Sequence, residues 1–303
     1  MNHVLTLVAA QPEGLTPAIV AEAGAALNAE SGVIGEPHWL ASGKACDIPF
    51  SADDITGIRM AVRAAINGPE KRIDLHAGPT FGRRKKLLLA DMDSTIVTSE
   101  TLDELAAFAG LKDEVAAITT RAMNGELDFE ASVRERVRML TGLDESLLAR
   151  TFEDVELTSG AETLVRTMAA NDARCVLVSG GFKYFTSRVA KLCGFHFDFA
   201  NDFVIEDGKL TGDVAAPILT RHAKLDNLEA QAEELGLSLN ETVAVGDGAN
   251  DLLMIQAAGL GAAFHGKPLV AEMAPARIDH GDLMALLYYQ GYSKSEFVNV
   301  SVE

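Results

Sequence analysis

Two aspartates near residue 90 are the first candidates for chemistry. The apolar run LLLA at residues 87–90 leads directly into Asp91 and Asp93. Such a run is typical of a buried strand in a parallel sheet, and open α/β sheets bind ligands at the carboxyl ends of their strands. Alternate residues of extended backbone project to the same side, so both carboxylates are expected to face one reacting group. One could attack and the other could transfer protons.

Taken alone, an Asp-x-Asp pair is more often part of a solvated turn. Two further strand patterns, however, favour a catalytic site. The apolar run at 174–178 ends in Ser179-Gly180-Gly181, where a hydroxyl and backbone N–H groups could approach an anion. The run at 242–245 ends in GDGAND at 246–251, and Lys224 lies between the two patterns. Strand ends carrying acids, a hydroxyl and glycines, with a separate lysine, predict a magnesium-dependent phosphoryl-transfer site.

In this combination the chain resembles the haloacid dehalogenase-like (HAD) superfamily of aspartyl-phosphate phosphatases. Its four motifs match, in the expected order, DMDST at 91–95, VLVSGG at 176–181, Lys224 and VGDGAND at 245–251. A narrower resemblance, to the phosphoserine phosphatases within that superfamily, is carried by Glu100, Arg136, SGGF at 179–182, KLTGDV at 209–214 and GDGAND. The resemblance covers residues 85 to 290.

The resemblance implies catalytic and metal-binding roles for four aspartates. Asp91 would be the nucleophile, and Asp93 would protonate the leaving oxygen and later deprotonate water. Magnesium would be held by Asp91, the backbone carbonyl of Asp93, and Asp247. Asp251 would support this shell from behind, although an aspartate after glycines is equally typical of a helix N-cap.

The resemblance also implies a set of substrate contacts. The residues assigned to the phosphate are Ser179, Gly180, Lys224 and Asn250. Glu100 could accept hydrogen bonds from an ammonium group, while Arg136 presents a planar fork to a carboxylate. Together they would suit the zwitterionic head of an amino acid.

The implied reaction is hydrolysis of O-phospho-L-serine to L-serine and phosphate through an aspartyl-phosphate, the last step of serine biosynthesis. Three alternatives stay open: a phosphatase acting on another small ester such as phosphohomoserine or a sugar phosphate, a ligand-sensing module with a scaffold-like phosphatase domain, and a nucleic-acid-associated phosphatase. The presence of the catalytic acids weighs against a ligand-sensing module. The net negative charge of the chain weighs against a nucleic-acid-associated phosphatase.

Charge narrows the range of partners. The formal charge is −18 at pH 7, which opposes non-specific binding to nucleic acid or a membrane surface, because both need clustered Lys and Arg. A phosphate ester is itself anionic, and the net negative charge of the chain repels it. Salt screens this repulsion beyond about 8 Å, so local positive charge must attract the ester, supplied by a metal, Lys224 and Arg136.

The cysteines and the start of the chain predict a cytoplasmic location. Cys46, Cys175 and Cys193 are widely spaced, which favours reduced thiols over a disulfide framework or a zinc site. The first residues show no basic segment ahead of a sustained apolar run, and no stretch reaches the ~18 apolar residues of a membrane span.

The predicted fold is α/β: a HAD-like doubly wound parallel sheet (Rossmann-like) with a helical cap insertion, preceded by a small ferredoxin-like α+β domain. Residues 85–303 form the predicted phosphatase domain, with the cap at about 99–157, where the sequence turns helical and charged. Residues 195–219 alternate around Glu206 to Lys209 and predict a hairpin. Helices are expected at 225–235 and 252–258 around the strand at 242–245.

Residues 1–80 form the predicted first domain. Strands are expected at 3–10, 36–41, 44–49 and 72–76, with helices at 15–28 and 52–67. This βαββαβ order resembles the ACT-like regulatory domains, and it leaves open whether the domain binds an amino-acid effector or forms a homodimer. The basic run at 83–86 is predicted to be a solvated linker.

Overall fold

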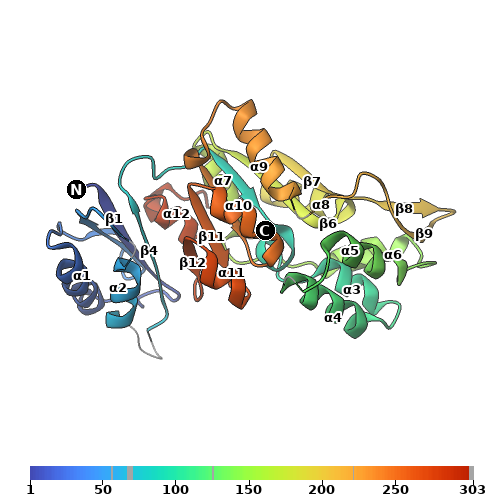
Figure 1. Ribbon diagram of the computed structural model, residues 1–303, viewed down its shortest axis with the longest axis horizontal. Helices are drawn as coiled ribbons and strands as arrows, with labels where there is room; N and C mark the ends of the chain where they lie inside the picture. Colours follow the sequence, from blue (N-terminus) through green and yellow to red (C-terminus); the bar gives the residue numbers. More distant parts are fainter. Residues whose placement is uncertain (56, 67–70, 125, 221, 300–303) are drawn as a thin grey trace.

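The computed structural model describes residues 1–55, 57–66, 71–124, 126–220 and 222–299. Within these ranges the strands form a four-stranded sheet, a six-stranded sheet and a two-stranded hairpin. Figure 1 shows the first sheet at one end of the long axis and the hairpin at the other. The predicted helix end at residue 67 and the predicted domain end at 300–303 lie outside the described residues.

The first sheet has the expected βαββαβ order. Its elements are β1 (His3–Ala9), α1 (Pro17–Ser31), β2 (His38–Ala41), β3 (Ala45–Phe50), α2 (Ile58–Ile66) and β4 (Ile73–Pro79). The strands pair antiparallel in the order β2-β3-β1-β4, and Leu5 and Leu7 are buried in the apolar cluster formed with α1 and α2. The predicted start of the second helix at residue 52 is wrong, because Asp53, Asp54 and Gly57 favour a turn before Ile58.

The six-stranded sheet is doubly wound, as predicted. Its strands, in spatial order, are β12 (Ala276–Ile278), β11 (Leu260–Phe264), β10 (Thr242–Gly246), β5 (Leu87–Ala90), β6 (Arg174–Phe182) and β7 (Phe197–Asn201), all parallel. Successive leucines of β5 point to opposite faces, since Leu88 belongs to one apolar cluster and Leu87 and Leu89 to another. Both faces of the central strand are therefore buried.

Helices cover both faces of this sheet. They are α7 (Ala161–Ala170), α8 (Lys183–Cys193), α9 (Ala223–Glu234), α10 (Leu252–Ala257), α11 (Pro268–Met273) and α12 (Ala285–Tyr289). Residues of α7, α8 and α12 share the cluster of Leu88, and residues of α9, α10 and α11 share that of Leu87. Among the described helices, none combines the length and apolar character needed to cross a membrane.

The predicted cap is present between β5 and β6. Its helices are α3 (Thr101–Ala107), α4 (Lys112–Met123), α5 (Phe129–Arg138) and α6 (Ser146–Glu153). The hairpin of β8 (Phe203–Glu206) and β9 (Lys209–Val214) reaches across to this cap, and Leu210 exchanges backbone hydrogen bonds with Gly142 and Leu143. Figure 1 shows the hairpin beyond α5 and α6. The hairpin thus joins the cap to the sheet domain.

The hairpin prediction for residues 195–219 is wrong in its first part. Residues Phe197–Asn201 form β7, which pairs parallel with β6 at the edge of the six-stranded sheet. Alternation of apolar and polar residues is typical of both an edge strand and a hairpin strand, so the pattern could not distinguish them.

The face of the first sheet opposite its helices packs on the second domain. Val8, Leu40 and Ala45 belong to the same apolar cluster as residues of α12. The solvated-linker prediction for 83–86 is wrong for Arg83, whose guanidinium donates to Asp47 (2.6 Å) and Thr6 (2.9 Å) on the first sheet and to the Tyr288 carbonyl (3.3 Å). It is also wrong for Lys85, which is buried and donates to the Asn240 carbonyl. The division of the chain at residues 80–85 stays a prediction.

Asp74 anchors the same interface from β4. Its fully buried carboxylate accepts backbone N–H groups of Asp279 (2.8 Å), His280 and Gly281 (2.7 Å) from the segment after β12. We predict that Asp74→Ala lowers the free energy of unfolding by about 1–3 kcal/mol, because it leaves buried N–H groups without acceptors. Denaturant unfolding of this variant should be compared with Asp53→Ala, which removes an exposed acid of the same domain. Equal effects of the two substitutions would show that Asp74 does not anchor the interface.

Candidate active site

The carboxyl ends of three adjacent strands bring the predicted site residues together. Asp91 and Asp93 follow β5, Ser179 lies near the end of β6, and Asp247 follows β10. The central β5 pairs with β6 on one side and β10 on the other. From β5 the chain winds to β6 and β7 on one side, and it later returns to β10, β11 and β12 on the other side of β5. The strand order therefore reverses between β5 and β10, and such a switch point is where open α/β sheets form ligand sites.

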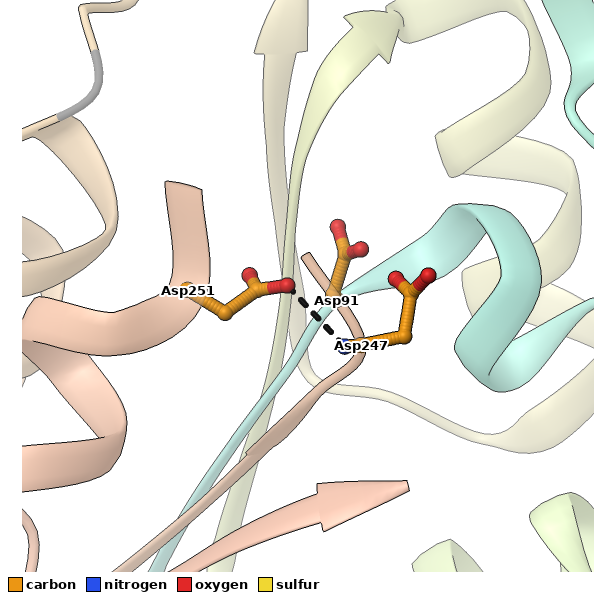
Figure 2. Close-up of side chains that lie close together, drawn as sticks. All are labelled: Asp91, Asp247 and Asp251. Carbon is orange, nitrogen blue, oxygen red and sulfur yellow. Dashed lines mark hydrogen bonds between the residues drawn. The ribbon is translucent and has the colours of Figure 1, made fainter. Parts of the chain in front are cut away.

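Three buried carboxylates form the centre of the site. Asp91, Asp247 and Asp251 each offer an oxygen, and these oxygens lie within 4.8 Å of one another. Figure 2 shows the Asp91 and Asp247 side chains projecting to the same side, with Asp251 approaching from the helical segment at the left of the view. The Asp251 carboxylate accepts the backbone N–H groups of Asp247 (3.1 Å) and Gly248 (2.9 Å). It therefore fixes the loop rather than capping the helix that follows.

Lys224 links two of these acids. Its ammonium, 4% exposed as a residue, donates to Asp91 and to Asp251 at 2.5 Å each. Burial alone would lower the pKa of Lys224, but the charges of Asp251 and Asp91 outweigh that effect and raise it. Lys224 therefore stays protonated and holds both carboxylates in place.

Gly246 permits this close packing. A Cβ at position 246 would overlap the Asp251 carboxylate, so only glycine lets that carboxylate reach the loop N–H groups. The sequence motif GDGAND thus combines a backbone requirement at its first position with charge at its second and last.

The donor atoms fit a divalent cation. Burial, together with Asp251 and Asp91, raises the pKa of Asp247 to about 8, and burial followed by Asp251 raises that of Asp91 against the opposing effect of Lys224. The Asp247 Oδ1 and Asn250 Oδ1 atoms are buried with no hydrogen-bond partner among the described residues. Clustered hard oxygen donors of this kind are the ligands that Mg²⁺, Ca²⁺ and Mn²⁺ prefer.

Asp93 is held by contacts from two elements. Its Oδ1 accepts the backbone N–H (2.8 Å) and the hydroxyl (2.7 Å) of Thr101 at the start of α3, and its Oδ2 accepts from Ser179 Oγ (3.0 Å). The Ser179 hydroxyl in turn accepts the Gly181 N–H at 2.8 Å. The carboxylate is therefore oriented before any substrate binds.

A small cavity of about 50 Å³ lies between the sheet edge and the cap. The predicted site residues that line it are Asp91, Asp93, Glu100, Arg136, Ser179, Gly180 and Asn250. Lys224 lines an adjoining pocket, together with Asn250 and Gly180. The structure thus gathers every predicted site residue into one region, while their roles stay predictions.

Glu100 lies on the cap side of this cavity. Its carboxylate accepts a hydrogen bond from Ser94 Oγ at 2.5 Å. Burial and the nearby Asp93 charge raise the pKa of Glu100 to about 8, although the Ser94 hydrogen bond opposes this. A ligand ammonium placed beside Glu100 would reverse the shift, because an opposite charge favours the ionised carboxylate.

Sequence reasoning missed several residues of the site. Thr101 and Thr119 line the cavity, and the Phe129 ring covers Gly180 so closely that a Cβ at position 180 would overlap it. Lys267 places its ammonium 3.8 Å from Asp247. Threonine and phenylalanine within amphipathic helices carry no signal of their own, and Lys267 is brought near only by the loop after β11.

Comparison with known proteins gives consistent findings. The family model of haloacid dehalogenase-like hydrolases matches residues 88–256. A phosphoserine phosphatase of Archaeoglobus fulgidus is 44% identical over 207 residues, covering 68% of this chain and 60% of that protein. One from Methanocaldococcus jannaschii is 42% identical, covering 68% of this chain and 98% of its own length. This chain therefore spans less than two thirds of the first of these relatives.

A solved structure extends the likeness to the first domain. A HAD family hydrolase from Salmonella enterica serovar Typhi superposes with a TM-score of 0.81 at 26% identity, covering 95% of this chain and 98% of its own.

We predict that Asp247→Asn abolishes stabilisation by a divalent cation. In the absence of metal the pKa of Asp247 is about 8 in the folded protein against an ordinary 3.8, so ionisation opposes folding as pH rises between these values. A cation that replaces the proton should therefore raise the Tm more at pH 8 than at pH 6. Thermal unfolding with and without Mg²⁺ after chelator treatment tests this, with the exposed Asp213→Asn as control. An unchanged Mg²⁺ response in Asp247→Asn would remove this residue from the ligand set.

Proposed function

Because the chain belongs to the haloacid dehalogenase-like hydrolase family, we propose that it is a magnesium-dependent phosphoserine phosphatase. The observation that carries the proposal is the cavity that joins Asp91 and Asp93 to Glu100 and Arg136. One end offers groups for phosphoryl transfer, and the other offers a carboxylate and a guanidinium for an amino-acid head. Relatives that bear this name support the same substrate.

In the first proposed step a carboxylate oxygen of Asp91 attacks phosphorus. The bond between phosphorus and the serine oxygen breaks, and Asp93 gives that oxygen a proton, so that L-serine leaves as the neutral alcohol. Lys224 holds the Asp91 carboxylate through its 2.5 Å contact, and Ser179, the Gly180 N–H and Asn250 would bind phosphate oxygens.

In the second step water attacks the phosphorus of the aspartyl-phosphate. Asp93, now ionised, takes a proton from this water, and the bond between phosphorus and the Asp91 oxygen breaks to release phosphate. The contacts of Asp93 with Thr101 and Ser179 keep one carboxylate in position for both proton transfers.

We propose magnesium as the metal, held by Asp91, Asp247 and the backbone carbonyl of Asp93. When bound, the ion would offset the negative charges of the nucleophile and the phosphate. Asp251, engaged by Lys224 and two backbone N–H groups, would support this set without ligating.

The proposal extends to location and to the first domain. The three cysteines are free and buried, which supports a reducing, cytoplasmic environment. For the first domain we propose a contact with a second copy of the chain, since β2 is an edge strand with Trp39 partly exposed. Whether an amino-acid effector binds there is for serine titration to answer.

We predict that Asp91→Asn lowers phosphate release from phosphoserine by on the order of 10³-fold or more, because an amide cannot accept the phosphoryl group as a carboxylate does. Its Tm should not fall, since the substitution removes a charge from a buried acidic cluster. Phosphate release and thermal unfolding check both statements. Residual turnover within tenfold of wild type would contradict the role of nucleophile.

We predict that Arg136→Ala raises the KM for phosphoserine at least about tenfold, as expected for loss of a charged hydrogen bond. Phosphoethanolamine, which keeps the ammonium and the phosphate but lacks the carboxylate, should be affected much less. Arg134→Ala, on an exposed turn of the same helix, is the control. Equal losses for the two esters would argue that Arg136 supports only the cap.

A further inference from the structure

Arg136 is a buried cation without a salt bridge. Its residue is 9% exposed, and among the described residues no carboxylate oxygen lies within the 4.0 Å salt-bridge distance of its guanidinium. Burial lowers the pKa of Arg136, and the more distant charges of Asp103, Glu100 and Asp93 oppose that effect. A buried charge is costly unless something compensates it, so the surrounding contacts must both hold and balance this guanidinium.

Two contacts fix its orientation. The Nε atom donates to the Ser132 carbonyl one turn earlier in α5 (3.2 Å), and Nη1 donates to Thr119 Oγ1 on α4 (3.0 Å). Thr119 is itself buried and lines the cavity. The guanidinium therefore depends on a neighbouring cap helix for its position.

The Thr119 hydroxyl is oriented by an acid on a third helix. Its oxygen lies 2.7 Å from Asp103 Oδ1 on α3 and 3.1 Å from the Val115 carbonyl. A hydroxyl has one proton and two lone pairs, and the proton must point to one of these two acceptors. The lone pairs are then left to accept from Arg136.

Asp103 can compensate the charge of Arg136 without taking up the N–H donors of its guanidinium. The carboxylate is buried, 6% exposed, and reaches the guanidinium only through the Thr119 hydroxyl. A carboxylate in direct contact would take the fork that a substrate carboxylate needs. Placed one hydroxyl away, it attracts the cation while leaving donors of Arg136 available.

We propose that Asp103 and Thr119 are positioning residues that hold Arg136 ready for the carboxylate of the substrate. The inference rests on the proposed phosphoserine specificity. It adds two residues that are not among the substrate contacts proposed above. We call the hydrogen-bonded series from Asp103 through Thr119 to Arg136 the relay. It joins α3, α4 and α5, so recognition of the substrate carboxylate depends on how these three cap helices pack.

The test uses Thr119→Val, which keeps the side-chain shape but removes the acceptor, and Thr119→Ser, which restores it. Thr120→Val changes the exposed neighbouring threonine on the same helix and is the matched control. KM and kcat are measured for phosphoserine and phosphoethanolamine. We expect Thr119→Val to raise the KM for phosphoserine about tenfold, as for a lost charged hydrogen bond. Its KM for phosphoethanolamine should change less than twofold, and Thr119→Ser and Thr120→Val should behave as wild type.

Asp103→Asn is the second variant, and it decides the question should Thr119→Val not fold. It keeps an acceptor for Thr119 but removes the charge, and the same selective rise in KM for phosphoserine is expected. A parallel loss on both esters, or no loss on either, would overturn the relay. Wild-type protein that does not prefer phosphoserine over phosphoethanolamine would instead overturn the proposed function, and the relay with it.

Discussion

The hydrogen bonds of Lys224 to Asp91 and Asp251 are the interaction on which the rest of the site depends. Asp91, Asp247 and Asp251 lie within one buried cluster, and their mutual repulsion would separate them without an internal cation. Lys224 joins Asp91, the proposed nucleophile, to Asp251, which in turn holds the loop of Asp247 through its backbone N–H groups. One ammonium thereby aligns groups that follow β5 and β10. The remaining negative charge, expressed in the raised pKa values of Asp91 and Asp247, is what a divalent cation would neutralise.

The cap presents the complementary problem, a buried positive charge. Arg136 has no salt bridge among the described residues, and Glu100 is a partly buried acid whose pKa is raised to about 8. Each is a charge that the protein compensates only in part, and both line the same cavity. A zwitterionic substrate would supply the missing partners, so the cost of burying these groups is offset when the substrate binds. Selectivity for such a substrate would then follow from this one electrostatic arrangement.

The sequence predicted the parts of this structure that rest on local pattern. The LLLA run of β5 and the glycines of GDGAND each indicate the end of a buried strand. The site lies at the carboxyl ends of these strands, as predicted. The interface of the two domains was not predictable, because Arg83 and Lys85 look like linker charges until the fold surrounds them with acceptors. Thr119 and Asp103 were missed for a related reason: their chemistry arises only where α3, α4 and α5 meet. Residues 197–201 were assigned to the wrong pairing since alternation does not reveal a strand's partner.

Asp91 is the proposed acceptor of the phosphoryl group, and chemical trapping can identify the acceptor by its position in the chain. The protein is mixed with phosphoserine and Mg²⁺, quenched in acid and treated with borohydride. Borohydride reduces an acyl-phosphate to an alcohol, which converts the modified aspartate to homoserine. Peptide mass spectrometry is then expected to locate homoserine at position 91 and at no other aspartate. Homoserine at position 93 or 247, with Asp91 unmodified, would rule out Asp91 as the acceptor of the phosphoryl group.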